Sequence, residues 1–239
     1  MLLSEIKKYC YPEHKKEKDL QVSLWLYFVI RPASFYFTYF ALKVKIGPNH
    51  ATFIGFIIGL VSLILAGNGS YFLAALFLNI FAIIDCVDGN LARLKKPSKL
   101  GEYFDAISGD IINFGFLLVL LLSALNEGHF SNLENYVPIN LIYIIFATGF
   151  FQILIGLTNQ RFHNIFFFSD KDTLKKNMPK VEIILRNGFG VAFLYPTSLI
   201  ISFLEGFEVL LIYLVISTPF FYIISLLRVF LINKKNYEK

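Results

Sequence analysis

Long apolar runs alternate with short polar segments over most of the chain. A helix that crosses a bilayer needs about 20 mainly apolar residues, and six runs approach or exceed that length. They lie near residues 49–66, 71–92, 102–125, 139–159, 187–204 and 209–231. The pattern therefore predicts an all-α, polytopic membrane protein with six transmembrane helices.

The apolar stretch before the first predicted span is interrupted. Residues 20–46 contain Arg31-Pro32 near their middle, and a proline inside a helix removes a backbone donor and disfavours its continuation. Each half is too short to span a bilayer. We therefore expect two short amphipathic pieces that lie along the membrane surface, after a polar and exposed start at residues 1–19.

The distribution of basic residues predicts the orientation. The connections at 67–70, 126–138 and 205–208 contain no Lys or Arg, so six spans place all 22 basic residues on one side. Cytoplasmic loops carry the excess of Lys and Arg, and both termini and the 93–101 loop are expected to face the cytoplasm. A seventh span within 20–46 is the rival interpretation, but it would put the lysine-rich N-terminus on the opposite side.

Composition agrees with this class and narrows it. Of the 239 residues, 56% are hydrophobic and the mean hydropathy is +0.61, which excludes an ordinary soluble domain. The net charge of +5 reports topology and not nucleic-acid binding. We divide the chain into a cytoplasmic and interfacial N-terminal segment, 1–46, and a six-span membrane domain, 47–239.

Four carboxylates fall beside or within the second and third spans: Asp85, Asp88, Asp105 and Asp110. Unpaired at bilayer depth, they would together cost about 10–14 kcal/mol, which a fold must offset. Asp85 and Asp88 are three residues apart and share one helix face. Oxygen ligands of this kind favour one or two Mg²⁺ or Mn²⁺ ions.

Small and basic residues follow these carboxylates. Gly89 and Ala92 leave the backbone open to close approach, Arg93 is a planar donor suited to phosphate, and Gly101 opens the third span. The pattern predicts an acidic, metal-binding pocket for a diphosphate. A pair of aspartates at a span end is more often a solvated helix terminus, but the full set is hard to explain that way.

A long motif runs through these positions: Asp85-x-x-Asp88-Gly89-x-x-Ala92-Arg93, seven further residues, and Gly101-x-x-x-Asp105. It resembles the motif of the CDP-alcohol phosphatidyltransferase family. The stretch Gly47-Pro48-Asn49-x-x-Thr52 before the first span also fits that family, whereas residues 130–239 match it only in hydropathy.

The resemblance implies a chemistry for each position. That family displaces CMP from a CDP-linked donor with an acceptor hydroxyl and uses a divalent metal. By position, the metal ligands would be Asp85, Asp88 and Asp105, and the CDP moiety would contact Gly89, Ala92, Arg93 and Gly101, with Asn49 and Thr52 lining the donor pocket. The resemblance also suggests a homodimer.

The chain departs from the family pattern at the last carboxylate. The family ends in Asp-x-x-x-Asp, but Gly109 stands four residues after Asp105 and Asp110 stands five after it. On a straight α-helix Asp110 would lie about 140° from Asp105. A one-residue π-bulge beside Gly109 would return Asp110 to the site as catalytic base and metal ligand. Glu102 is a weaker candidate for the base.

These features favour a membrane phosphotransferase of phospholipid biosynthesis, with a CDP-alcohol donor and a hydroxyl acceptor. CDP-diacylglycerol is the favoured donor because apolar span surfaces suit acyl chains; a soluble CDP-alcohol and the acceptor's identity stay open. A catalytically silent CDP-lipid binder is one alternative. A small metal-ion or solute transporter is another, but ion passage needs no nucleotide-sized gap at Gly89 and Ala92.

Overall fold

A computed structural model describes residues 2–95, 99–129, 147–151, 194–204 and 223, and every regular element within these ranges is helical. This confirms the all-α class. The elements are α1 (Leu3–Cys10), α2 (Glu13–Val22), the π-helical turn η1 (Leu26–Ile30), α3 (Arg31–Lys43), α4 (Pro48–Gly67), α5 (Tyr71–Lys95), α6 (Lys99–Asn126) and α10 (Leu194–Leu204).

Three helices are long and apolar enough to cross a membrane. They are α4, α5 and the stretch Tyr103–Asn126 of α6. Long apolar runs form helices in lipid because a helix satisfies all of its own backbone hydrogen bonds. The first three predicted spans, at 49–66, 71–92 and 102–125, therefore coincide with three candidate membrane-spanning helices.

The other three predicted spans lie wholly or mainly outside the described residues. The structure describes residues 147–151 of the span predicted at 139–159, residue 223 of that at 209–231, and α10 within that at 187–204. The count of six spans stays a prediction.

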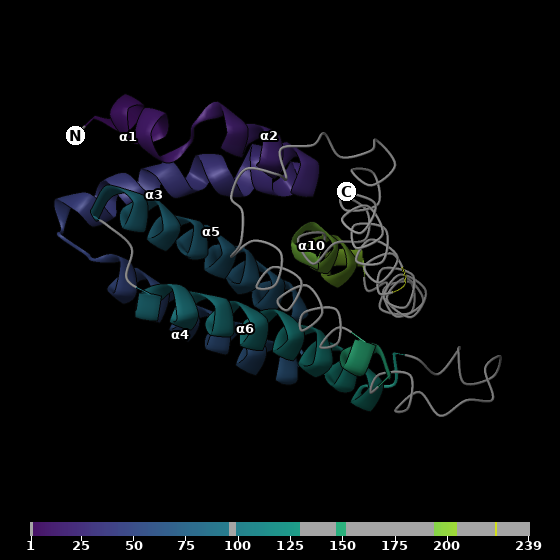
Figure 1. Cartoon of the computed structure of the whole chain (residues 1–239). Coiled ribbons are helices and arrows are strands. Elements are labelled where there is room, and N and C mark those ends of the chain that lie inside the picture. Colours follow the sequence, from purple (N-terminus) through teal and green to yellow (C-terminus); the bar gives the residue numbers. More distant parts are fainter. Residues whose placement is uncertain (1, 96–98, 130–146, 152–193, 205–222, 224–239) are drawn as a thin grey trace, which may run out of the picture.

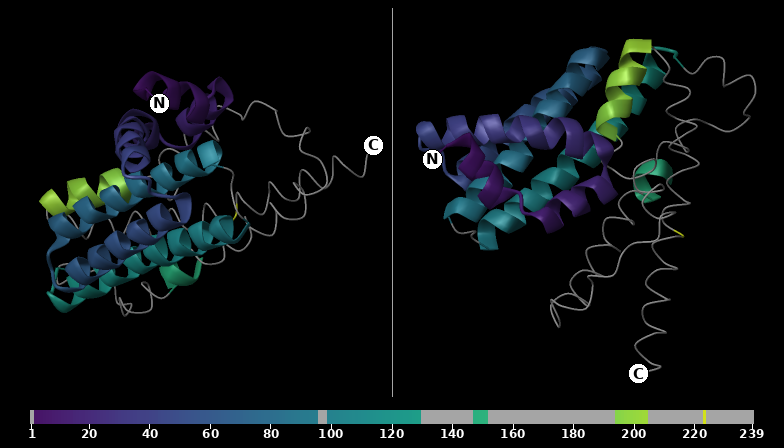
Figure 2. Two further views of the ribbon diagram at one scale, coloured as in Figure 1. Left: turned by 90° about the vertical axis from the view of Figure 1, so that its left-hand side faces the viewer. Right: turned by 90° about the horizontal axis from the view of Figure 1, so that it is seen from above.

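Helix α5 lies at the centre of the described helices. The N-terminal helices α1, α2 and α3 lie on one side of it and α4 and α6 on the other (Figures 1 and 2). Both α3 and α10 also pack against α5. The helix that carries Asp85 and Asp88 is thus enclosed by elements from both ends of the described chain.

Glycines on α4 set its distance from the neighbouring spans. A Cβ added to Gly59 would lie only 2.6 Å from Ile112 of α6, and one added to Gly55 would lie 3.2 Å from Ile84 of α5. Small residues allow close helix approach in membranes, where tight packing replaces the hydrophobic effect. These contacts fix the relative position of α5 and α6.

The N-terminal residues fold onto the spans instead of projecting from them. Ile6 and Cys10 of α1 are fully buried, in a cluster with Phe35 of α3. Asp19 of α2 accepts a hydrogen bond from Arg31 at 2.7 Å, with both side chains 7% exposed. The expectation of an exposed start is therefore wrong for one face of α1 and for the end of α2.

The helix break expected at Arg31-Pro32 is also wrong. Helix α3 follows η1 directly, with helical backbone angles at Ile30 and Arg31 (φ −65°, ψ −48° at each). The break lies at Ser23, where the backbone is extended. The π turn η1 lies just before Pro32, and its last hydrogen bond runs from the Arg31 N–H to the Leu26 carbonyl oxygen. Whether residues 20–46 lie along the membrane surface stays a prediction.

Candidate active site

Asp85 and Asp88 lie in the second half of α5, on the same face of the helix. Asp88 is 4% exposed and Asp85 is half-buried. The residues around them are apolar, including the buried Ala82, Val87 and Leu91. Two acidic groups are therefore held inside a membrane-spanning helix bundle, where charge is costly.

A third carboxyl group reaches this pair from α6. Asp105 makes a side-chain hydrogen bond with Asp85, and its charge also acts on Asp88. Carboxyl groups approach this closely only when a proton or a cation lies between them. The structure thus brings Asp85, Asp88 and Asp105 together from two helices.

One carboxylate oxygen in this cluster lacks a partner. Within the described residues, Asp88 Oδ2 is buried without a hydrogen-bond donor. Thr52 of α4 lies beside Asp88, but its hydroxyl has one proton and two acceptors in reach, the Asp88 carboxylate and the Pro48 carbonyl oxygen at 3.1 Å. A buried anionic oxygen left in this way fits a hard divalent cation.

The cluster is not a closed ligand shell. No three His, Cys, Asp or Glu side chains in the described part of the chain form a ready metal-binding group. The oxygen-only donor set and the orphaned Asp88 Oδ2 nevertheless fit Mg²⁺ or Mn²⁺. Asp85, Asp88 and Asp105 are the residues that would hold such an ion.

Arg93 lies over Gly89, one turn beyond the aspartates. A Cβ added to Gly89 would lie 3.6 Å and 3.8 Å from the two terminal nitrogens of Arg93, with no other atom closer. Arg93 itself is exposed, and Ala92 is half-buried beside it. A phosphate group in front of Gly89 would therefore meet guanidinium N–H donors.

The remaining residues predicted at the site are less closely placed. Gly101 lies near the start of α6 and is half-buried, and Asn49 is exposed on the first turn of α4. Of the two α4 residues predicted at the site, Asn49 and Thr52, it is Thr52 that contacts Asp88. The side chain of Glu102 lies outside what the structure describes.

Asp110 is not brought to the other carboxylates. Helix α6 is α-helical throughout Lys99–Asn126, so the π-bulge predicted beside Gly109 is wrong. Asp110 is exposed, and the regular helix leaves it about 140° around the axis from Asp105. The space beside Gly109 is open, with no atom within 4 Å of an added Cβ, so no neighbour forces the helix to deform.

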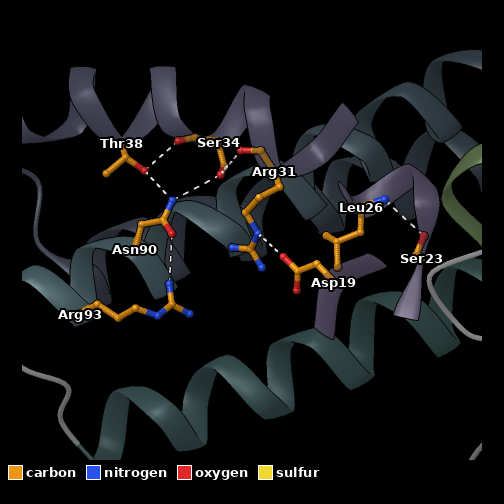
Figure 3. Close-up of polar contacts among 8 residues, drawn as sticks. All are labelled: Asp19, Ser23, Leu26, Arg31, Ser34, Thr38, Asn90 and Arg93. Carbon is orange, nitrogen blue, oxygen red and sulfur yellow. Dashed lines mark hydrogen bonds and ion pairs between the residues drawn. The ribbon is translucent and has the colours of Figure 1, made fainter. Parts of the chain in front are cut away.

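Asn90 is the residue at this site that sequence reasoning missed. It is fully buried and contacts Arg93 as well as Ser34 and Thr38 of α3 (Figure 3). The sequence feature that could have pointed to Asn90 is a polar residue within an apolar helix, three positions before Arg93.

Comparison with known proteins bears on the identity of this site. The family model described as CDP-alcohol phosphatidyltransferase matches residues 45–221. A protein of Thermococcus kodakarensis, named bifunctional IPC transferase and DIPP synthase, is 36% identical over 87 residues. Its counterpart of the same name in Archaeoglobus fulgidus is 39% identical over 83 residues.

These two matches are partial on both sides. They cover 36% and 34% of this chain, and 20% and 17% of the respective relatives. The match therefore spans between about one sixth and one fifth of the length of each curated relative.

Proposed function

The chain belongs to the CDP-alcohol phosphatidyltransferase family, and we propose that it displaces CMP from a CDP-alcohol with an acceptor hydroxyl, forming a phosphodiester. The observation that carries this proposal is the acidic cluster of Asp85, Asp88 and Asp105, which contains an orphaned buried oxygen. Gly89 and Arg93 stand beside that cluster, where a diphosphate would need an opening and a cationic donor.

Each residue has a role in this proposal. The three carboxylates hold one or two Mg²⁺ or Mn²⁺ ions, which when bound offset the diphosphate charge and stabilise the leaving CMP. Arg93 orients a phosphate by charge-assisted hydrogen bonds. Gly89 and Ala92 leave room for the nucleotide, and Gly101, Asn49 and Thr52 line its pocket.

CDP-diacylglycerol is the donor we favour. Tyr103 and Phe104, immediately before Asp105, are 60% and 58% exposed, and Phe53 on α4 is 64% exposed. This apolar surface beside an acidic site suits a ligand with a charged headgroup and acyl chains. Such a donor would place the enzyme in phospholipid biosynthesis. The relatives' names do not choose a donor, because the match covers a small part of a bifunctional protein.

Asp110 is the proposed base that accepts the proton of the acceptor hydroxyl. In a regular α6 it would have to act after a local rearrangement, since it lies about 140° from Asp105. The exposed position of Asp110 favours a second candidate function, a protein that binds CDP-lipid without turning it over.

We extend the proposal to the whole chain. Six spans would place both termini and the acidic site at the cytoplasmic face, because all basic residues then lie on one side. Two copies would form a homodimer in the membrane. Lipid would supply the donor, the acceptor or both.

The test is metal-dependent release of CMP by the purified full-length protein. CDP-diacylglycerol in mixed micelles and soluble CDP-choline serve as donors, each with Mg²⁺ or Mn²⁺ and a panel of hydroxyl acceptors. We expect CMP release that EDTA abolishes and added Mn²⁺ restores. Asp88→Asn should stop release without lowering thermal stability, because the variant removes an uncompensated buried charge.

The outcomes separate the two candidates. Binding of CDP-diacylglycerol without CMP release, whichever acceptor is present, would favour the silent binder. Absence of both binding and release would refute the proposal.

A further inference from the structure

Asn90 connects the aspartate-bearing helix to α3 at the level of Arg93. Its side chain is 0% exposed. Asn90 Nδ2 lies 3.0 Å from Thr38 Oγ1 and 3.3 Å from Ser34 Oγ. On the other side of the same amide, Oδ1 accepts a hydrogen bond from Arg93 Nη1 at 3.1 Å (Figure 3). One buried amide therefore links two hydroxyl groups to one guanidinium.

The two hydroxyl groups determine which way this amide points. Ser34 Oγ donates to the Arg31 carbonyl oxygen at 2.8 Å, and Thr38 Oγ1 donates to the Ser34 carbonyl oxygen at 2.7 Å. A hydroxyl has one proton, so both groups offer only lone pairs to Asn90. The amide nitrogen must face α3, and the amide oxygen must therefore face Arg93.

We propose that Asn90 is a positioning residue, which holds the Arg93 guanidinium over Gly89 in the orientation that receives the diphosphate of the donor. This inference rests on the proposed function. Arginine is long and flexible and samples many rotamers when it is free. A single fixed acceptor selects the rotamers in which the guanidinium stays at the site before any substrate arrives.

The geometry leaves Arg93 able to bind phosphate while it is held. A guanidinium has five N–H donors in a planar fork, and Asn90 takes one of them on Nη1. Nη2 lies 3.6 Å from the Cβ position of Gly89, on the side where the backbone lacks a side chain. The donors beyond the Asn90 contact suit the paired oxygens of a phosphate group.

The support for this amide comes from outside the part of the chain that matches the family. The family match begins at residue 45, whereas Ser34 and Thr38 lie before it. Cys10 of α1 also contacts the backbone of Asn90, with its Sγ 3.6 Å from the backbone carbonyl oxygen. The N-terminal helices would thus contribute to donor affinity through Arg93 without touching the donor.

A double-mutant cycle tests the coupling. Asn90→Leu keeps the approximate volume and removes the amide, and it is combined with Arg93→Ala. The matched control is Asn79→Leu on the same helix. Asn79 is 6% exposed and bonds Trp25 of the N-terminal segment and the backbone of Tyr195 in α10. Like Asn90 it is a buried interhelical amide, but it lies about four turns from Arg93.

Two readouts are needed: the Kd in the presence of Mg²⁺ for CDP-diacylglycerol, or for CDP-choline if the wild type binds only that, and the KM and kcat of CMP release. We expect Asn90→Leu to raise Kd and KM about tenfold, because it removes one hydrogen bond to a charged group. The kcat should change less than about threefold. In the Arg93→Ala background the same substitution should have no further effect. Asn79→Leu should lower thermal stability but leave Kd within about twofold.

Equal effects of the two Asn substitutions on Kd, or additive effects of Asn90→Leu and Arg93→Ala, would overturn the proposal and show a purely structural role. If Asn90→Leu does not fold, Ser34→Ala with Thr38→Val replaces it in the cycle. The Ser34→Ala and Thr38→Val double substitution should weaken binding about threefold, and only when Arg93 is present. An effect of the same size in the Arg93→Ala background would also overturn the proposal. A wild-type protein that neither binds CDP-choline nor CDP-diacylglycerol, and releases no CMP, would instead refute the proposed function.

Discussion

Gly89→Ala is the sharpest single test of the opening beside the aspartates. The added methyl group would lie 3.6 Å from Arg93 Nη2 and 3.8 Å from Nη1, which is ordinary van der Waals contact. The protein has room for it. Alanine is also favoured over glycine in a helix interior by about 0.8–1.0 kcal/mol. We therefore expect the variant to be at least as stable as the wild type.

The effect on activity should be opposite to the effect on stability. The methyl group would occupy the space in which the proposed donor approaches the backbone, between the acidic cluster and Arg93. We expect CMP release to fall about five- to 150-fold, because steric overlap with the donor should cost about 1–3 kcal/mol. A stable and inactive variant is the predicted outcome.

Two glycines on the neighbouring helix α4 serve as controls for this measurement. Gly67→Ala places its Cβ 3.4 Å from Val119, a normal contact at the end of α4 far from the aspartates, and should leave activity unchanged. Gly59→Ala brings its Cβ to 2.6–2.9 Å from three atoms of Ile112. Overpacking of that kind costs about 1–3 kcal/mol, so this variant should lose thermal stability.

The assay combines thermal unfolding in detergent with CMP release and Kd for the CDP-alcohol. Wild-type kinetics and affinity in Gly89→Ala would refute the reasoning, because the space before Gly89 would then play no part in donor binding. A loss of stability in Gly89→Ala comparable to that in Gly59→Ala would contradict the packing described above.

The remaining predictions concern the buried ion pair and the carboxylates of α6. Asp19→Asn should cost about 3–5 kcal/mol in thermal unfolding, because it leaves the Arg31 charge buried without its partner; combining it with Arg31→Met should recover stability, and a further loss would contradict this. Asp105→Asn and Asp110→Asn should both abolish CMP release, but only Asp105→Asn should weaken Mn²⁺ binding strongly; equal weakening would make Asp110 a ligand. Gly109→Asp should restore some CMP release to Asp110→Asn, since position 109 is open and lies about 40° from Asp105 on the helix; no gain would argue against a missing base.

Two predictions made from local sequence were wrong: the helix break at Pro32 and the π-bulge beside Gly109. Proline predicted a break at residue 32, but a π turn just before it kept the helix continuous, and the break occurs at Ser23. Spacing suggested that Asp110 needed a bulge to reach the site, but α6 stays regular. In both cases the sequence showed that a conflict existed, and the folded chain determined how it was resolved.

The positions of α5 and α6 relative to each other could not be predicted from spacing. The contact of Asp105 with Asp85 depends on how closely α4 approaches both helices, which Gly55 and Gly59 permit. Sequence reasoning named the aspartates because carboxylates in apolar helices are costly and need compensation. It did not reveal that Asp88 would keep one oxygen without a donor.

The amino-acid sequence alone determined the first three candidate spans and the shared face of Asp85 and Asp88, because these depend on properties that repeat along one helix. It also determined the family, through a motif within residues 45–221. Lipid forces each apolar run to satisfy its own backbone hydrogen bonds, so its helical state follows from composition and length. Only the tertiary structure decided that Asp105 completes the acidic cluster, and that Asn90, which bonds hydroxyl groups of α3, also accepts a hydrogen bond from Arg93. Those contacts join residues far apart in the chain, and their geometry depends on the packing of several helices at once.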